Sequence, residues 1–422
     1  MNINKSEKRL KLMLSHLKQC NCANSDNDKS GILYNLLSTH ILEVSLNQPK
    51  KLNSINDKMV KNLLNHVKNW VSFEYKFPKR LQDELEKLQT TVKEVPRVIL
   101  MTGVGKAFCA GGDVTSLYQN KINEKENKRN QLFLNYEFVL DYFLTRMMPL
   151  QIVYWNGPVM GGGVGVSINA PIRIATEATV FAMPECVIGL YPDVGATWFL
   201  PRIFNDNTSI GLYVGLTGHK IKGKELVKCG VATHFMTNDQ YKMFKESLIK
   251  AVTKNSTNEE IILLCNSFSD VVYSKKDFYF ENEDFINKVF QLDSLQNIVN
   301  RLKDFELNGN EREKKLSNNI LSIFAKSSPI SMIVYFEQHI RGCKIKTREE
   351  AYNIESQLAD VFMEDNDFYE GVRARLVEKS NDPKWEYKTI NDVNQKELIA
   401  KYFESGNKEN PLKFSYLDYI LK

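Results

Sequence analysis

Two glycine turns and two nearby acids supply the residue types needed to polarise and attack a carbonyl group. Residues 151–155 form an apolar run that predicts a strand, Gly161, Gly162 and Gly163 follow it, and residues 164–170 predict a short helix. A helix that begins at glycines offers unpaired N–H groups and the positive end of its dipole. Such a turn suits an oxyanion, a phosphate or a thioester carbonyl that gains negative charge.

A second glycine turn lies upstream, in the stretch KAFCAGGD at residues 106–113, and it follows another strand-like run at 97–101. Each turn has a backbone N–H to offer to one oxygen, and two such donors form an oxyanion hole. Glu185 and Asp193 lie downstream of the second turn and would supply acid, base or nucleophile. The alternative for each piece alone is a tight turn or a solvated acid, but the combination favours chemistry.

The bulk composition limits the classes of protein to consider. The chain has 422 residues, of which 43% are hydrophobic and 25% charged, and this length favours a large domain plus a smaller lobe. The formal net charge of +5 favours an anionic small ligand over nucleic acid. No apolar run is long enough to predict a membrane span. The 7 cysteines and 6 histidines are dispersed without metal-ligand spacing, so we expect free thiols and no metal site.

The apolar patterning predicts alternating strands and helices, and therefore an α/β fold with βα layering. We expect an N-terminal extension or presequence at 1–32, a core at 33–236, a polar helical connecting segment at 237–315, and a C-terminal helical lobe with a loosely specified tail at 316–422. The expected strands are 41–46, 97–101, 151–155, 171–175 and 180–183, and the expected helices are 55–71, 114–118, 132–147 and 164–170. Residues 72–94 predict a surface excursion, and the charge run 121–130 predicts a loop.

Two segments leave alternatives open. Residues 5–18 are basic, with Glu7 as their only acid, which fits either a mitochondrial presequence or a surface extension. Glu137 lies among the apolar positions of the helix expected at 132–147, so it is either a half-exposed helix residue or a residue of the pocket.

These stretches resemble the crotonase superfamily of acyl-CoA enzymes. The motifs that carry the resemblance are KAFCAGGD at 106–113, MGGGVG at 160–165, FAMPE at 181–185, IGLYPDVG at 188–195, FLPR at 199–202 and LTG at 216–218, with DF at 367–368, EGVRA at 370–374 and PKW at 383–385 near the C-terminus. The resemblance implies a crotonase-like spiral of ββα units with a C-terminal helical region that helps cover the site.

The resemblance also assigns roles to residues. It implies an oxyanion hole formed by the N–H groups of Gly112 and Gly162, with Glu185 and Asp193 as the catalytic acids. Glu137 matches a substrate-contacting acid, and Lys379 is similar to a basic residue near the phosphates of coenzyme A. No cofactor is implied, because coenzyme A is part of the substrate; no nucleic-acid or membrane partner is expected, and the oligomeric state stays open.

The position of Gly165 separates reactions within the superfamily, because hydratases carry a second catalytic Glu there. The resemblance therefore implies hydrolysis of a short β-hydroxyacyl-CoA thioester, with 3-hydroxyisobutyryl-CoA as the expected substrate. The basic segment at residues 5–18 predicts a mitochondrial location, with a cytoplasmic one as the alternative. The alternatives are a hydratase or isomerase on the same fold, and a non-catalytic acyl-CoA or RNA-binding protein.

Overall fold

The computed structural model describes residues 30–67, 70–71, 95–122, 127–291, 293–404 and 412. The predictions for the leader before residue 30 and for the excursion at 72–94 lie outside these ranges. Within the described residues no single helix is long and apolar enough to cross a membrane, although the bent pair Glu311–Phe324 and Pro329–Gly342 has the length and composition to do so together.

The molecule contains a seven-stranded sheet in the order β1-β2-β3-β4-β6-β9-β10, and a three-stranded sheet in the order β5-β7-β8 lies beside it. In the larger sheet the pairs from β2 to β9 are parallel, and the outer pairs β1–β2 and β9–β10 are antiparallel. The strands are β1 (Ile32–Ser38), β2 (Ile41–Leu46), β3 (Val98–Gly103), β4 (Leu150–Trp155), β5 (Pro158–Met160), β6 (Ile172–Ala175), β7 (Val180–Ala182), β8 (Ile221–Lys222), β9 (His234–Phe235) and β10 (Val271–Val272).

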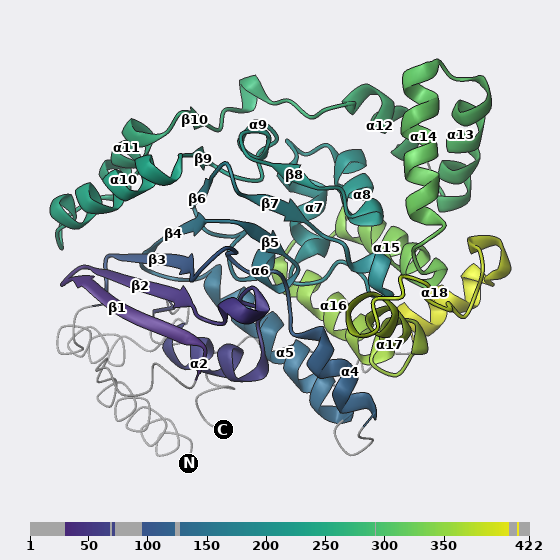
Figure 1. Cartoon of the computed structure of the whole chain (residues 1–422), viewed down its shortest axis with the longest axis horizontal. Coiled ribbons are helices and arrows are strands. Elements are labelled where there is room, and N and C mark those ends of the chain that lie inside the picture. The colour runs from purple at the N-terminus through teal and green to yellow at the C-terminus, as the bar shows by residue number, and fades with distance from the viewer. Residues whose placement is uncertain are drawn as a thin grey trace, which may run out of the picture.

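Helices cover both faces of the larger sheet and continue into the C-terminal half (Figure 1). The first set comprises α2 (Asp57–Val67), α4 (Val114–Ile122), α5 (Asn127–Leu144), α6 (Gly162–Gly165), α7 (Ala196–Ile203), α8 (Thr208–Thr217), α9 (Glu225–Lys228), α10 (Asn238–Ala251) and α11 (Asn258–Phe268). The second set comprises α12 (Glu283–Phe290), α13 (Leu295–Asn308), α14 (Glu311–Phe324), α15 (Pro329–Gly342), α16 (Arg348–Phe362), α17 (Asn366–Val372) and α18 (Gln395–Phe403). Short 3₁₀ turns occur at Pro49–Lys51, Glu185–Ile188, Lys275–Asp277 and Ile390–Asp392, and one π-helical turn at Arg373–Val377.

The central parallel strands β2, β3 and β4 are mostly apolar because both of their faces are buried. In β3, Val98 and Leu100 pack with residues of α10 and α11 in one cluster, whereas Ile99 and Met101 point to the opposite face and join the larger core. This alternation is the period of two expected for a strand. Figure 1 shows α10 and α11 on one side of the sheet and α2 and α5 on the other.

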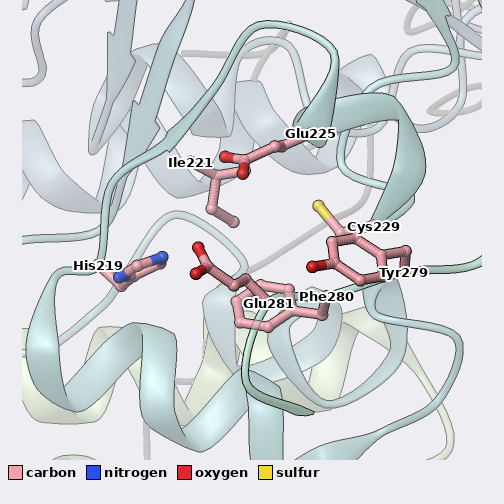
Figure 2. A pocket seen from close by; sticks show the side chains of 7 residues that line it. All are labelled: His219, Ile221, Glu225, Cys229, Tyr279, Phe280 and Glu281. Carbon is pink, nitrogen blue, oxygen red and sulfur yellow. The ribbon is translucent and has the colours of Figure 1, made fainter. Parts of the chain in front are cut away.

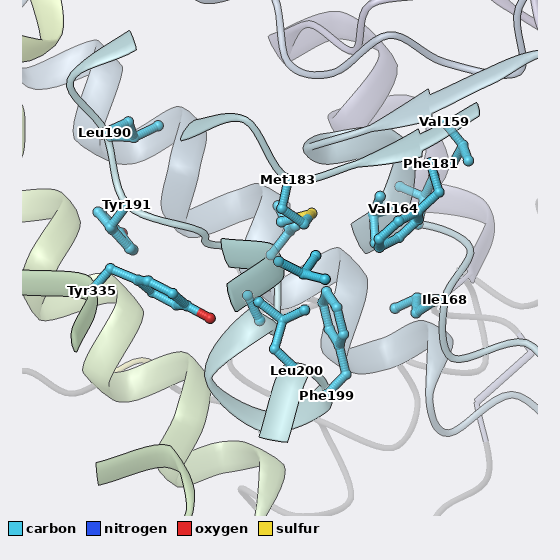
Figure 3. Packing of buried hydrophobic residues seen from close by; sticks show 14 of the residues in the cluster. Val159, Val164, Ile168, Phe181, Met183, Leu190, Tyr191, Phe199, Leu200 and Tyr335 are labelled. Carbon is cyan, nitrogen blue, oxygen red and sulfur yellow. The ribbon is translucent and has the colours of Figure 1, made fainter. Parts of the chain in front are cut away.

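The larger core continues beneath the glycine turns and into the C-terminal helices. Figure 3 shows Val164 beside the β5–β7 sheet, with Phe199 and Leu200 of α7 and Tyr335 of α15 around the same centre. A single apolar cluster therefore joins the strands that carry the glycine turns to the helices that follow residue 316.

The strands expected at 41–46, 97–101, 151–155, 171–175 and 180–183 correspond to β2, β3, β4, β6 and β7, and the helices expected at 55–71, 114–118 and 132–147 correspond to α2, α4 and α5. The helix expected at 164–170 was wrong in position, because α6 ends at Gly165 and turns follow it. These corrected bounds place the start of α6 at the middle glycine of the run.

Two other expectations were wrong. Residues 127–130 of the charge run belong to α5, where the Asn130 side chain donates to the backbone oxygen of Leu117 (2.9 Å) and ties α5 to α4. The C-terminal tail contains α18, whose buried Leu398, Tyr402 and Phe403 pack it onto the preceding helices. In both segments a few buried side chains outweigh a polar local composition.

Candidate active site

The two glycine turns lie side by side because the segments that contain them pair in parallel. Cys109 and Val159 form a parallel bridge, in which Cys109 N–H donates to the Pro158 oxygen (3.0 Å) and Met160 N–H donates to the Cys109 oxygen (3.0 Å). The chain then continues from each segment directly into its glycines. Residues fifty positions apart in sequence are therefore brought to one place.

Gly112 and Gly162 face each other across this pairing. A Cβ atom added to Gly162 would lie 3.3 Å from the Gly112 nitrogen and would collide with Oε1 of Glu137. Within the described part of the chain, neither the Gly112 N–H nor the Gly162 N–H has a hydrogen-bond acceptor. Two unpaired N–H donors at one buried place are the arrangement required to bind an oxygen that gains negative charge.

Glu185 lies on the other side of the glycine run. It begins a 3₁₀ turn after Pro184, and its Oε1 lies 3.2 Å from the position that a Cβ atom of Gly161 would take. Its Oε2 is buried and has no hydrogen-bond partner. Burial, followed by the nearby charge of Asp193, raises the pKa of Glu185 well above its usual value. A carboxyl group in this state suits attack or proton transfer.

Asp193 lies in the loop that leads into α7, and it is also buried. Burial raises its pKa to about 7, against the lowering effect of a backbone hydrogen bond. The two residues that follow, Val194 and Gly195, have φ angles of 53° and 91°. A left-handed conformation is strained for the β-branched Val194 and needs support from its surroundings.

That support comes from helices α15 and α16 of the C-terminal region. The Glu355 carboxylate accepts hydrogen bonds from Gly195 N–H (2.7 Å) and Thr197 N–H (2.9 Å), which satisfies the free N–H groups at the start of α7. The Gln338 amide donates to the Pro192 oxygen (2.7 Å) and to the Thr197 hydroxyl (2.8 Å). Both side chains are fully buried. The C-terminal helices therefore hold the Asp193 loop in place.

Glu137 is buried beside the glycine turn, so the half-exposed helix position is wrong, and a role in the pocket stays a prediction. It is 2% exposed, its Oε1 has no partner, and it lies against Gly162. Burial raises the pKa of Glu137 well above its usual value, with a further contribution from the charge of Asp193.

Sequence reasoning missed two acids of this site, Asp141 and Glu355. Asp141 follows Glu137 by one helical turn, and a second acid at that spacing in an otherwise apolar stretch was an available signal. Burial, followed by the charges of neighbouring acids, raises the pKa of Asp141; burial raises the pKa of Glu355 to about 8. No local pattern marks Glu355, because its partners lie about 160 residues away. We use the name acid cluster for Glu137, Asp141, Glu185, Asp193 and Glu355.

Lys379 lies outside the acid cluster. It is an exposed residue with a φ of 58°, just after the π-helical turn Arg373–Val377. A separate small cavity is lined by His219, Glu225 and Glu281 among others (Figure 2). Among the described residues, no group of three or more His, Cys, Asp or Glu side chains is arranged to hold a metal ion.

Comparisons with known proteins agree on one family. Residues 72–403 match the family model described as enoyl-CoA hydratase/isomerase. The mitochondrial 3-hydroxyisobutyryl-CoA hydrolase of Dictyostelium discoideum is 36% identical over 379 residues, which are 88% of this chain and 91% of that protein. The mitochondrial 3-hydroxyisobutyryl-CoA hydrolase of Homo sapiens is 30% identical over 372 residues, 88% of each chain.

Solved structures show the same fold. A carnitinyl-CoA dehydratase from Mycobacterium thermoresistibile superposes with a TM-score of 0.72 at 25% identity and covers 92% of this chain and 99% of its own. An enoyl-CoA hydratase from Rhodobacter sphaeroides superposes with a TM-score of 0.68 at 23% identity and covers 91% of this chain and 100% of its own. The crotonase-like fold expected from the motifs is confirmed.

Proposed function

Because this chain belongs to the enoyl-CoA hydratase/isomerase family, we propose that it hydrolyses a short β-hydroxyacyl-CoA thioester. The substrate is 3-hydroxyisobutyryl-CoA, and the products are 3-hydroxyisobutyrate and coenzyme A. The identity of 30–36% over most of the chain to relatives that are named as hydrolases of this ester supports both the reaction and the substrate.

The mechanism rests on two unpaired backbone N–H groups that lie together beside a buried carboxyl group. The thioester oxygen binds between the N–H groups of Gly112 and Gly162, which stabilise the negative charge that forms on it. A glycine is needed at 162 because any side chain there would collide with Glu137. Glu185 lies against the same run of glycines and acts on the carbonyl carbon.

Two routes fit this geometry. In one, Glu185 attacks the carbonyl carbon, the C–S bond breaks to give a mixed anhydride and coenzyme A thiolate, and water then hydrolyses the anhydride. In the other, Glu185 takes a proton from a water molecule that attacks the carbon directly. In both routes the thiolate is a good leaving group, since a free thiol has a pKa of about 8.5. The reaction needs no cofactor.

Asp193 either binds the hydroxyl group of the substrate or positions the attacking water, and Glu137 shapes the pocket beside the oxyanion hole. Glu355 and Gln338 act through Asp193, because they hold the loop on which it lies. Lys379, exposed on the surface, is available to the phosphates of coenzyme A.

The direct test is the substitution Glu185→Gln, followed by thiol release from 3-hydroxyisobutyryl-CoA. The variant keeps the shape of the side chain but has no carboxylate, so we expect it to bind the ester and to release almost no thiol. Near-full hydrolysis by this variant would remove Glu185 from the mechanism. Loss of the enoyl absorbance of crotonyl-CoA would instead identify a hydratase, and the absence of thiol release by the unmodified protein would identify a binding protein.

We also propose a mitochondrial location. The relatives are named as mitochondrial, and the basic segment at residues 5–18 is compatible with a presequence. Imaging of the full chain with a C-terminal fluorescent tag would test this, and a diffuse cytoplasmic signal would contradict it.

A further inference from the structure

Asp141 is a buried acid without a role in the mechanism described so far. Its side chain is 0% exposed, and within the described chain neither carboxyl oxygen has a hydrogen-bond partner. A buried polar group without a partner is costly, and an unpaired buried charge costs more. The carboxyl group is therefore held protonated, as its raised pKa indicates, with one O–H donor and an acceptor oxygen unused.

The position of Asp141 relates it directly to the oxyanion hole. Glu137 and Asp141 are one turn apart on the same face of α5. Glu137 occupies the space that a side chain at Gly162 would take, and Asp141 occupies the corresponding space at Gly165. The two acids therefore lie beside the first and the last residue of α6, which are about 4.5 Å apart along the helix axis. Asp141 lies one step beyond the oxyanion hole.

The Gly165 end of α6 lies in buried, closely packed surroundings. Every residue of α6 is buried, and Val194, next to Asp193, closes the other side of Gly165. The titratable groups that face Asp141 are Glu137 on its own helix, Asp193 on the loop, and Glu355 and the ring hydroxyl of Tyr352 on α16. All of these except the Tyr352 hydroxyl are carboxyl groups. A neutral hydroxyl group, which both donates and accepts, fits beside such acids better than an anion does.

We propose that Asp141 binds the β-hydroxyl group of the acyl chain and so determines the preference for hydroxylated thioesters. This inference rests on the proposed function. With the thioester oxygen at the Gly162 N–H, the β-carbon lies two bonds from the thioester carbon, and its hydroxyl reaches the Gly165 end of α6. The Asp141 carboxyl group forms its missing hydrogen bonds with that hydroxyl group, and Asp193 then positions the attacking water.

The test compares thiol release from 3-hydroxyisobutyryl-CoA and from isobutyryl-CoA, which lacks only the hydroxyl group. The unmodified protein should prefer the hydroxylated ester. In Asp141→Ala we expect kcat/KM for the hydroxylated ester to fall about 10- to 100-fold, the effect of losing one or two hydrogen bonds in a pocket, with kcat/KM for isobutyryl-CoA changed by less than about threefold. Asp141→Asn keeps a donor and an acceptor and should retain most of the preference.

Gly165→Ala is a second variant that leaves Asp141 in the chain, and its new Cβ atom would collide with the Asp141 carboxyl group and with Cβ of Val194. Because the Asp193 loop is displaced too, the ratio of the two substrates, and not the activity itself, is the quantity that reports on Asp141. This variant should lose the same preference, and it keeps the proposal testable if Asp141→Ala does not fold. The matched control is Glu43→Gln on β2, a buried acid that is already paired with Lys245 and lies on the far side of the sheet. This control should leave the ratio of the two substrates unchanged.

The outcomes are distinct. If the unmodified protein releases thiol from neither ester, the proposed function fails. If it hydrolyses both equally, the hydrolase stands and the role of Asp141 is wrong. If Asp141→Ala or Gly165→Ala lowers both activities by the same factor, Asp141 only maintains the fold of the pocket, and the proposal is overturned.

Discussion

Two buried polar regions of this molecule differ in whether their groups have partners. Near β6 and β9, the guanidinium group of Arg173 donates to the backbone oxygens of Val231 (2.8 Å), Ala170 (2.7 Å) and Gly230 (3.3 Å). In the same region, both ring nitrogens of His234 bond to neighbouring side chains. In the acid cluster, by contrast, oxygens of Glu137, Asp141 and Glu185 are buried without partners.

The difference separates groups that hold the fold from groups that await a ligand. A partnered buried group contributes modestly to stability, and its loss exposes the cost of the partners left behind. An unpartnered buried acid destabilises the free protein, and a bound substrate or water molecule that hydrogen-bonds to it would offset that cost. Substitutions in the two regions should therefore affect different quantities, turnover in the acid cluster and stability near Arg173.

The largest effect on turnover outside Glu185 should come from Gly162→Ala. The added methyl group collides with Glu137 and separates the two N–H donors, so we expect kcat/KM for thiol release to fall about 100- to 1000-fold, as for loss of an oxyanion-hole donor. The control is Gly223→Ala, where no atom lies closer than 4.0 Å to the new Cβ atom and the cost is the backbone strain at a φ of 51°. Equal activities of the two variants would contradict the oxyanion hole.

Glu355→Gln should have an intermediate effect. The amide can accept only one of the hydrogen bonds from Gly195 and Thr197, so one buried backbone N–H is left unpaired at a cost of about 1–3 kcal/mol. We expect kcat to fall about tenfold with little change in KM, since Asp193 is displaced and the substrate contacts are not. Glu337→Gln, at a half-buried pair with Arg341 on α15, is the matched control. A lower melting temperature with unchanged kcat would mean that Glu355 serves stability alone.

Arg173→Met should leave turnover per folded molecule within about twofold of the original. Removing the guanidinium group leaves the oxygens of Val231, Ala170 and Gly230 unpaired, at a cost of about 1–3 kcal/mol for each group that water does not reach. Urea unfolding measured beside thiol release would separate the two quantities. A large fall in kcat without loss of stability would break the distinction between the regions.

The smallest expected effect is a dependence of the free energy of unfolding on pH. The pKa values of Asp193 and Glu355 are raised to about 7 and about 8 by burial, above the values of about 3.9 and 4.3 in an unfolded chain. The folded state therefore binds more protons, and the free energy of unfolding falls as pH rises from about 4 to about 8, by at most about 1.4 kcal/mol per pH unit for each group.

Asp193→Asn removes one of these groups and should reduce that slope. Melting temperatures between pH 5 and pH 8 would measure it, and the variant should gain on the original protein as pH rises. If the variant instead loses stability relative to the original protein as pH rises, Asp193 is ionised and stabilised in the folded state.

The chemistry-bearing residues could be predicted because local sequence marks them. Glycines follow apolar strands at 161–163 and at 111–112. A backbone that turns sharply without room for a side chain requires glycine, so the residue type itself marks these turns. The alternation of apolar strands and helices likewise predicted the α/β fold. The separation of the domains at 236 and 315 and the roles of the site residues stay predictions.

Only the tertiary structure decided which acids are buried together. Glu137 and Asp141 face inward because α5 packs against the glycines of α6, and Glu355 reaches the Asp193 loop because α16 packs against the start of α7. Burial raises the pKa values of these acids most, followed by nearby like charges, and burial depends on the packing of segments that are far apart in sequence. The sequence therefore determined which groups are available, whereas packing determined which of them are left without partners.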